Sequence, residues 1–239
     1  MTPPGGFAAR GRPGAAEPRR AGSFARDGGG RSAHPDRRHP RRQRRKGGAA
    51  LAAAFRERHP GVEVRIHETD FTDPTAGVRS GRADIALTRA PFDRSAMTVR
   101  VLRSDPIGVV LRADDPLARR SSLELADLVE RRWFRLPEDT DAQWRACWIP
   151  SRVRSDGPVL RTIHECVQAV LWNDTVGLTA MGHDLQPGLT VVPLRDHPPS
   201  ELVLAWNSAD HNPLVHSFAR ITAAVTRRDR LRRGPDRPR

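Results

Sequence analysis

The sequence predicts an α/β fold, and three adjacent segments support this prediction. Residues 49–58 consist of good helix formers, which indicates a helix. Residues 62–67 alternate apolar and polar side chains, with the period of two expected of a strand whose faces differ. Residues 83–87 form a second, apolar strand, and Asp73-Pro74 opens a short helix between the two strands. Two strands joined through a helix are most easily parallel, so we expect one half-turn of an open α/β sheet.

Turn residues separate these elements and mark where the strands end. The His-Pro-Gly run at 59–61 ends the first helix, and Gly81 can end the second in a left-handed conformation. Ligands of open α/β sheets bind beyond the carboxyl ends of the strands. In this chain those ends are residues 68–71 and the pair Thr88 and Arg89, so we expect a ligand there.

The remaining chain continues to alternate strands and helices. Two capping boxes, Ser121 with Glu124 and Thr162 with Glu165, predict the starts of two helices. The buried face of the first of these helices should comprise Leu123, Leu125, Leu128 and Val129. Strands are predicted at 97–103, 107–111, 133–136, 176–180, 189–192 and 202–206, and further helices at 142–149 and from 212 to 225.

The positive charge of the chain is concentrated at its two ends. The formal net charge is +13, but residues 1–46 hold 13 Arg or Lys against three acidic residues, and residues 227–239 hold seven Arg against two Asp. The middle part, 47–226, therefore has a net charge of −2. Both ends have few large apolar side chains, so we expect disordered basic tails at 1–46 and 227–239. Such tails would make at most non-specific, salt-sensitive contacts with nucleic acid.

The same sequence disfavours several classes of protein. It has no continuous apolar run near its start, so neither a signal peptide nor a membrane span is predicted, and we expect a cytoplasmic protein. Cys147 and Cys166 lie in apolar helical patterns that are typical of buried thiols in a reducing compartment. No nucleophile elbow, phosphate-binding loop or zinc-protease motif occurs. We therefore predict no enzyme activity, no catalytic residue, no metal and no cofactor.

The motifs resemble those of the effector-binding domain of LysR-type transcriptional regulators. The matching elements are Phe55, the run HPGV at 59–62, Glu68 at the end of its strand, and the run SGRADIA at 80–86. Their spacing fits the family without a gap. The turn RADDPLA at 112–118 also matches a turn that is characteristic of the family.

The resemblance covers about 49–226 and implies a specific architecture. It implies two Rossmann-like subdomains joined by two crossover strands, which is a type 2 periplasmic-binding-protein-like fold with the basic tails outside it. Subdomain I would comprise 47–105 and 203–226, and subdomain II would comprise 106–202. The sequence departs from the family at 172–181, where the usual glycine-containing turn is missing, so the shape of the pocket there cannot be carried over.

The resemblance places the effector site in the cleft between the subdomains. Arg89 follows a strand end, where its guanidinium could hold a carboxylate, although a surface arginine in an arginine-rich chain is an equally open interpretation. Trp144 and Trp148, one turn apart, are more typical of a core pair. The predicted effector-binding residues are Thr69, Phe71, Thr88, Arg89, Pro137, Thr140 and Trp144, and the predicted hinge residues are Ser104, Asp105, Glu201 and Leu202.

The implied function is the sensing of a small organic, anionic effector by a LysR-type regulator, with a homodimer formed through this domain. A solute-binding protein of a transport system shares the architecture and is the alternative, although the chain has no export signal. LysR-type regulators carry an apolar strand, a linker helix and a winged helix-turn-helix before the first effector-domain helix, and 1–48 resembles none of these. We therefore expect a truncated or frame-shifted regulator without its own DNA-binding domain, and of marginal stability because a central strand would be missing.

Overall fold

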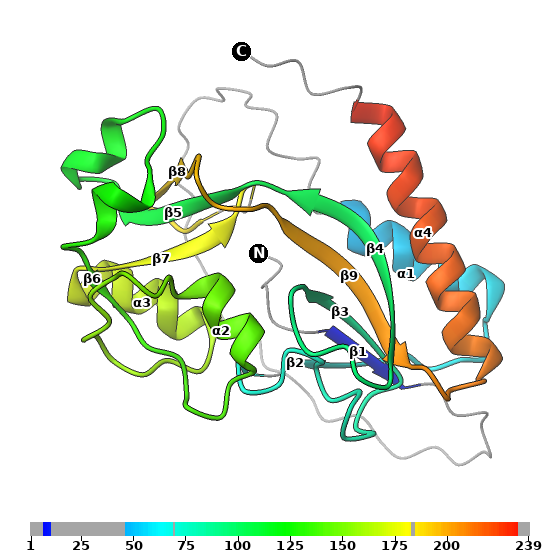
Figure 1. Ribbon diagram of the computed structural model, residues 1–239. Helices are drawn as coiled ribbons and strands as arrows, with labels where there is room; N and C mark the ends of the chain where they lie inside the picture. Colours follow the sequence, from blue (N-terminus) through cyan, green and yellow to red (C-terminus); the bar gives the residue numbers. More distant parts are fainter. Residues whose placement is uncertain (1–6, 11–45, 69, 183–184, 234–239) are drawn as a thin grey trace, which may run out of the picture.

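The computed structural model of the chain describes residues 7–10, 46–68, 70–182 and 185–233, which form two lobes side by side (Figure 1). Lobe I contains β1 (Phe7–Arg10), α1 (Lys46–Arg58), β2 (Arg65–Glu68), β3 (Ile85–Arg89), β4 (Met97–Asp105), β9 (Ser200–Asn207) and α4 (Pro213–Arg233). Lobe II contains β5 (Ile107–Arg112), the 3₁₀ helices η2 (Pro116–Arg119) and η3 (Leu125–Leu128), β6 (Arg132–Trp133), α2 (Ala142–Trp148), α3 (Ile163–Asn173), β7 (Thr175–Ala180) and β8 (Leu189–Pro193). The strand orders are β2-β1-β3-β9-β4 in lobe I and β6-β7-β5-β8 in lobe II. Both lobes are therefore mixed α/β, as predicted.

Two strands connect the lobes and lie side by side where they cross. In Figure 1, β4 continues into β5 as one curved ribbon, and β9 returns alongside it. At the crossing, Asp105 pairs with Ser200, and Ser104 pairs with Glu201. Leu202 follows Glu201 along β9 and pairs with Arg103, so the four residues predicted as the hinge lie together on adjacent antiparallel strands.

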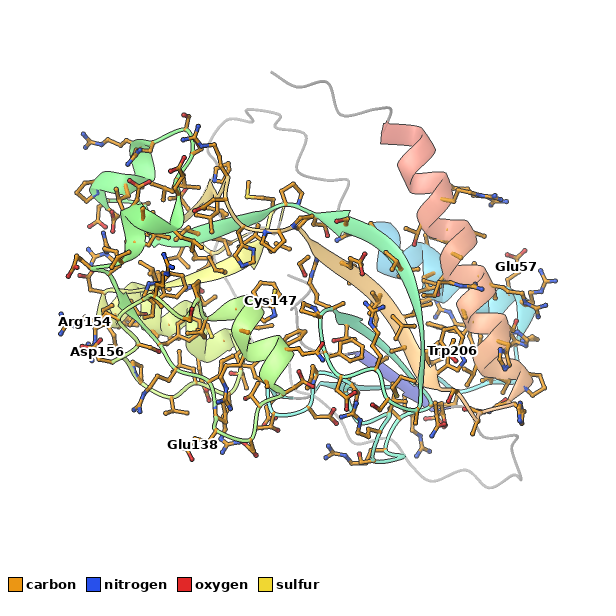
Figure 2. The ribbon with its side chains drawn as sticks, viewed as in Figure 1. Glu57, Glu138, Cys147, Arg154, Asp156 and Trp206 are labelled. Carbon is orange, nitrogen blue, oxygen red and sulfur yellow. The ribbon has the colours of Figure 1, made fainter. Side chains whose placement is uncertain are left out.

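Helices α1 and α4 pack against each other and cover the sheet of lobe I on one side. The ring of Phe55 in α1 is buried and lies 5.2 Å from that of Phe218 in α4, edge to face. Next to this contact, His59 Nε2 and Ser217 Oγ are 2.7 Å apart. Trp206 of β9, which Figure 2 labels beneath α4, is also buried in this core. The aromatic contacts fix α4 on the sheet that carries β9 back from lobe II.

The central strand of lobe II, β5, is covered on both faces. Val109 and Leu111 pack with Leu123 and Leu128 on one face, and Val110 lies under α3 on the other. A strand buried on both faces has no polar side to alternate with, and this explains its continuous apolar sequence. The sheet of lobe II is thus the rigid base on which α2 and α3 rest.

Strand β1 lies in a segment for which the sequence predicted no regular structure. It is inserted between β2 and β3 and is antiparallel to both, with Phe7 opposite Glu68 on one side and Leu87 on the other. The prediction of a gap at the centre of this sheet is therefore wrong, because β1 supplies the backbone partners that β2 and β3 need. Consequently β2 and β3 are parallel, as expected, but they are not neighbours. The remaining residues before Lys46 lie outside the described part of the chain, and so does the disorder predicted for them.

The helix predicted between β2 and β3 is instead a series of turns. Asp73 Oδ1 accepts a hydrogen bond from the backbone N–H of Thr75 at 2.9 Å, and Oδ2 accepts one from Gly77 at 2.8 Å. Ala76 and Gly77 have φ angles of 54° and 86°, and two such residues in succession interrupt helical geometry. Gly81 adopts the predicted left-handed conformation, with φ of 70°.

The helix predicted after residue 121 is a single 3₁₀ turn, η3. The backbone N–H of Glu124 donates to Asp127 Oδ2 at 2.9 Å, so the capping box begins at Glu124 and not at Ser121. Leu123 precedes the turn and is fully buried, whereas Val129 follows it and is 39 % exposed. The expected buried face is therefore wrong at Val129, because a short turn does not continue the helical stripe.

Helix α4 continues to Arg233, so the tail predicted to be disordered from residue 227 is helical up to that point. Arginine is a good helix former, and cationic side chains near a helix C-terminus interact favourably with the helix dipole. Arg227 and Arg228 are exposed on this extension. Among the described helices, none combines the length and the apolar character that crossing a membrane requires.

Candidate functional site

Arg89 ties β3 to both crossing strands. It is the last residue of β3 and is 2 % exposed. Its Nη2 donates to Asp105 Oδ2 at 2.8 Å, and its Nη1 donates to the backbone oxygen of Ser200 at 3.2 Å. Asp105 ends β4 and Ser200 begins β9, so one guanidinium holds the point where both strands leave lobe I.

A second guanidinium shares the same carboxylate. Arg103 Nε donates to Asp105 Oδ2 at 2.8 Å, and its side chain is 41 % exposed. Burial acts to raise the pKa of Asp105, but the hydrogen bonds and charges of Arg103 and Arg89 outweigh it and lower the pKa. Burial lowers the pKa of Arg89, while Asp105 opposes this change, and an arginine remains protonated at neutral pH. Within the cluster of Arg89, Arg103 and Asp105, two cations and one anion therefore leave a net positive charge.

Arg103 is not among the site residues that the sequence predicted. The signal that could have found it is the period of two along a strand, which places Arg103 and Asp105 on the same face of β4. Arg103 and Arg89 lie on different strands, so the sequence does not show that they share the carboxylate of Asp105.

Among the residues that the structure describes, three hydrogen bonds connect the lobes beside the crossing. The backbone N–H of Asp93 donates to Asp141 Oδ2 at 2.9 Å. The backbone N–H of Phe71 donates to the oxygen of Arg161 at 2.9 Å, and Arg161 Nη1 lies 3.4 Å from Asp70 Oδ2. Burial acts to raise the pKa of Asp70, but hydrogen bonds from Thr72 and Arg161 outweigh it and lower the pKa. The loops after β2 and β3 thus touch the starts of α3 and α2.

Asp141 has a second role besides this contact. Its Oδ1 accepts a hydrogen bond from the backbone N–H of Trp144 at 3.0 Å and so caps α2. The same helix holds the preceding loop, because Arg145 Nη2 donates to the backbone oxygens of Pro137 at 2.9 Å and of Thr140 at 3.2 Å. Thr140 is 4 % exposed, and its Oγ1 has no hydrogen-bond partner among the described residues.

The predicted site residues fall into two groups in the structure. Phe71 and Trp144 line one cavity together, and the backbone oxygens of Pro137 and Thr140 accept hydrogen bonds from Arg145, the residue after Trp144. Thr88 and Arg89 lie in the sheet of lobe I, where Thr88 is buried and its Oγ1 donates to the backbone oxygen of Pro74 at 2.7 Å. Thr69 lies outside the described residues. The role of these residues in effector binding remains a prediction.

The cavity has a volume of about 80 Å³ and lies in lobe II between β5 and β7 on one side and α2 and α3 on the other. A cavity wall and a filled core have the same apolar pattern in the sequence, so the sequence does not distinguish them. Trp144 and Trp148 are both buried, with ring centroids 5.6 Å apart. The residues that line the cavity are Phe71, Val110, Phe134, Leu136, Trp144, Trp148, Ile163, Cys166, Val167, Val170, Gly177, Leu178, Thr179 and Leu185.

Both cysteines are free thiols, as predicted, but they are half-buried and not fully buried as the sequence suggested. Burial raises the pKa of Cys147 to about 11, and burial, followed by the charge of Glu165, raises that of Cys166 further. Figure 2 shows Cys147 on α2, at the side of lobe II that faces lobe I. Its backbone oxygen lies 2.9 Å from Nε2 of His197, in the segment that leads to β9. Within the described ranges, no group of three or more His, Cys, Asp or Glu side chains could hold a metal ion.

Residues 49–227 match the family described as LysR substrate binding domain. No curated protein matches the sequence. The matched residues include both crossing strands, Arg89, Asp105 and every residue that lines the cavity.

Solved structures with the same fold include three ligand complexes. The BenM effector binding domain with its effector benzoate is 15 % identical, with a TM-score of 0.59, and the match covers 80 % of this chain and 88 % of that one. The CcmR regulatory domain of Synechocystis PCC6803 in complex with 2-PG is 15 % identical, with a TM-score of 0.59 and coverages of 76 % and 92 %. The effector binding domain of QuiR in complex with shikimate is 13 % identical, with a TM-score of 0.62 and coverages of 76 % and 90 %. At these identities the likeness establishes the fold, which is type 2 periplasmic-binding-protein-like.

Proposed function

The chain belongs to the LysR substrate binding domain family, and from this premise we propose that it senses a small organic anion as the effector of a LysR-type regulator. The observation that carries the proposal is the uneven charge at the strand crossing, where Arg89 and Arg103 share the single carboxylate of Asp105. The structures of relatives with benzoate and shikimate support the choice of a small organic acid. A solute-binding protein shares the fold, but the family match favours the regulator.

The proposed site lies between the lobes, beside the crossing. Its walls would be the predicted residues Phe71, Thr88, Arg89, Pro137, Thr140 and Trp144. Arg103 is added to this set because its guanidinium is partly exposed, whereas that of Arg89 is buried and already has two acceptors. An effector carboxylate would therefore meet Arg103 first, and Arg89 would supply the donors that Asp105 and Ser200 leave free.

Binding at this position would act on the hinge. A carboxylate that competes with Asp105 for the two guanidiniums weakens the link between β3, β4 and β9, and this changes the cost of bending at Ser104 and Asp105. A ligand shifts a conformational equilibrium by its difference in affinity for the two states, and this competition supplies such a difference. Hinge motion of two α/β lobes about a few strand residues is a common form of such a switch.

Two further parts of the proposal concern boundaries and partners. We retain subdomain I as 47–105 with the segment from 203, and subdomain II as 106–202, and we extend the C-terminal helix to Arg233. We also propose a homodimer through the effector domain. The exposed Arg227 and Arg228 at the end of α4 would at most give salt-sensitive, non-specific contacts with nucleic acid.

Isothermal titration with benzoate, shikimate and a set of other small carboxylic acids tests the proposal, with benzyl alcohol as the uncharged counterpart of benzoate. In Arg103→Gln the pair of Arg89 and Asp105 is neutral, so the affinity for the acid should fall about tenfold, which corresponds to one charged hydrogen bond. Arg154→Gln is the matched control, since Figure 2 places Arg154 at the outer edge of lobe II, where it pairs with Asp156. The proposal fails if no acid in the set binds, or if Arg103→Gln binds as tightly as Arg154→Gln.

A further inference from the structure

The imidazole ring of His197 lies between two backbone carbonyl oxygens. Its Nε2 is 2.9 Å from the oxygen of Cys147, and its Nδ1 is 2.8 Å from the oxygen of Pro198. A carbonyl oxygen can only accept a hydrogen bond, and a neutral imidazole has only one N–H. In the neutral ring, one nitrogen would therefore direct its lone pair at an oxygen. Both contacts are hydrogen bonds only in the imidazolium, in which both nitrogens donate.

The contact of Nε2 connects His197 to the C-terminal end of α2. Cys147, which Figure 2 labels, lies in the last turn of this helix. Carbonyl groups in the last turn of a helix have no partner within the helix itself. A donor from another segment satisfies one of these groups and holds the end of the helix in place.

His197 also lies close to the strand crossing along the chain. Three positions later, Ser200 begins β9, and its backbone oxygen accepts a hydrogen bond from Arg89. At the other end of the link, α2 carries Trp144 of the cavity wall, and its N-cap Asp141 accepts a hydrogen bond from a backbone N–H of lobe I. His197 therefore joins the two groups into which the predicted site residues fall.

The elements around the ring contain six charged or titratable groups, which are Arg145 and Cys147 on α2, Glu124 before η3, Arg195 and Asp196 in the segment before the ring, and Glu201 on β9. Arg195 pairs with Glu124 at 2.9 Å, and Asp196 accepts a hydrogen bond from the start of η3 at 3.0 Å. Burial raises the pKa of Cys147 to about 11, so its thiol stays neutral. Carboxylates and guanidiniums keep their charge between about pH 5.5 and pH 8.5, so the imidazole is the group of this set that titrates there.

We propose that His197 is a pH-sensitive positioning residue, which as an imidazolium holds the end of α2 to the entry of β9 and gives up one of its two hydrogen bonds when it loses a proton. The proton and the link favour each other, because the second hydrogen bond exists only in the protonated ring. The link is therefore complete at low pH and weakens as the pH rises through the titration of the ring.

The consequence for effector affinity rests on the proposed function, whereas the link itself does not. When the link is complete, α2 and the start of β9 are held in the arrangement that the structure shows. Loss of one neutral hydrogen bond between them should weaken the binding of an organic acid about fivefold. Effector binding would then be stronger at low pH.

Proton–nitrogen correlation spectra of the indole groups test the link without any ligand. Trp148 directly follows Cys147, so its resonance reports on the end of α2 that His197 holds. Between about pH 5.5 and pH 8.5, the range in which histidine titrates, we expect this resonance to move along a titration curve in the native chain and to stay fixed in His197→Gln. The proposal is overturned if the resonance does not move in the native chain, or if it moves equally in His197→Gln.

His216 provides the matched control. It is exposed on α4 in lobe I, and its ring lies 6.2 Å from that of Trp206. His216→Gln should abolish the pH response of the Trp206 resonance and leave that of Trp148 intact. The unchanged Trp206 curve in His197→Gln shows that this variant is folded. Loss of the Trp148 response in His216→Gln would contradict the assignment to His197.

His197→Arg separates the role of charge from that of titration. It keeps a cation with several donors that does not titrate in this range, so the Trp148 resonance should not depend on pH. Isothermal titration with benzoate or shikimate should show affinity about fivefold lower at about pH 8.5 than at about pH 5.5 in the native chain, and equal affinities in His197→Arg. Equal affinities at both pH values in the native chain contradict the positioning role. If neither acid binds at any pH, the proposed function loses its support, and the indole titration still decides whether the link exists.

Discussion

Arg89 and Asp105 form a buried ion pair, with 2.8 Å between Nη2 and Oδ2, at the point where the chain passes from lobe I to lobe II. The pair joins the end of β3 to the end of β4, and the same guanidinium also reaches Ser200 at the start of β9. One side chain thus holds the ends of three strands, two of which run between the lobes. This arrangement makes the pair a structural determinant of the proposed hinge as well as part of the proposed site.

Breaking the pair should destabilise the fold. Asp105→Asn leaves the guanidinium of Arg89 buried without its counter-ion, and removal of one partner of a buried pair costs about 3 kcal/mol in unfolding free energy. Equilibrium unfolding in urea measures the loss. Asp114→Asn is the control, because Asp114 pairs with Arg112 on the surface, and it should leave the urea midpoint unchanged. Equal midpoints for the two variants would contradict the structural role of Asp105.

The carboxylate of Asp105 should also make the free energy of unfolding depend on pH. The pKa of Asp105 is lower in the folded chain than in the unfolded chain, where an aspartate titrates near about 3.9. Its contribution is therefore complete above the unfolded value and is lost as the pH falls through the folded value. The stability difference between the wild type and Asp105→Asn should shrink below about pH 4. A difference that stays constant between pH 6 and pH 2 would show that the carboxylate is not stabilised by folding.

Asp141 should contribute more to the free energy of unfolding than a residue that only caps a helix. Asp141→Ala removes the cap of α2 and also the acceptor for Asp93, whereas Thr162→Ala removes only the cap of α3. A lost cap costs about 1 kcal/mol, so the excess of Asp141→Ala over Thr162→Ala reports the contact between the lobes. Both values come from urea unfolding. The interpretation is wrong if Asp141→Ala costs no more than Thr162→Ala.

Strand β1 should be necessary for lobe I. Deletion of residues 1–10 removes β1 from between β2 and β3 and exposes their facing edges, which promotes association between chains. Size-exclusion chromatography and thermal unfolding should show larger species and a lower midpoint. Deletion of residues 2–5, which leaves β1 in place, is the control. Identical behaviour of the two deletions would show that β1 adds nothing to the sheet.

The sequence predicted a helix start correctly where the hydrogen bonds that define it join residues close together in the chain. The capping box of Thr162 and Glu165 is present at the start of α3, because its bonds join residues three apart. The box expected at Ser121 moved to Glu124, since several polar residues in succession allow more than one start. Predictions of this kind succeed where only one local arrangement is available.

The features that the sequence could not reveal depend on residues far apart in the chain. The partner of Arg89 on β9, Ser200, is 111 positions away, and no pattern in either segment predicts the contact. Strand β1 has only four residues and pairs with strands more than fifty residues later, so its sequence shows no alternation to detect. The cavity beneath α3 has the same apolar pattern as a filled core. Tertiary pairing, and not local propensity, determines all three.

The distance between the lobes tests the central claim most directly. Glu57 on α1 and Glu138 in lobe II are exposed and lie on different lobes in Figure 2. The native thiols of Cys147 and Cys166 are half-buried, and their raised pKa values leave less of the reactive thiolate than at an exposed cysteine. Fluorophores at Glu57→Cys and Glu138→Cys should report a changed separation when benzoate, shikimate or another acid of the titration set binds at saturation. The account predicts this change in the otherwise native chain, and its loss in Arg103→Gln at the same concentration. Saturating binding with no change in separation, or the same change in Arg103→Gln, would contradict the claim that an organic anion acts on the hinge at the strand crossing.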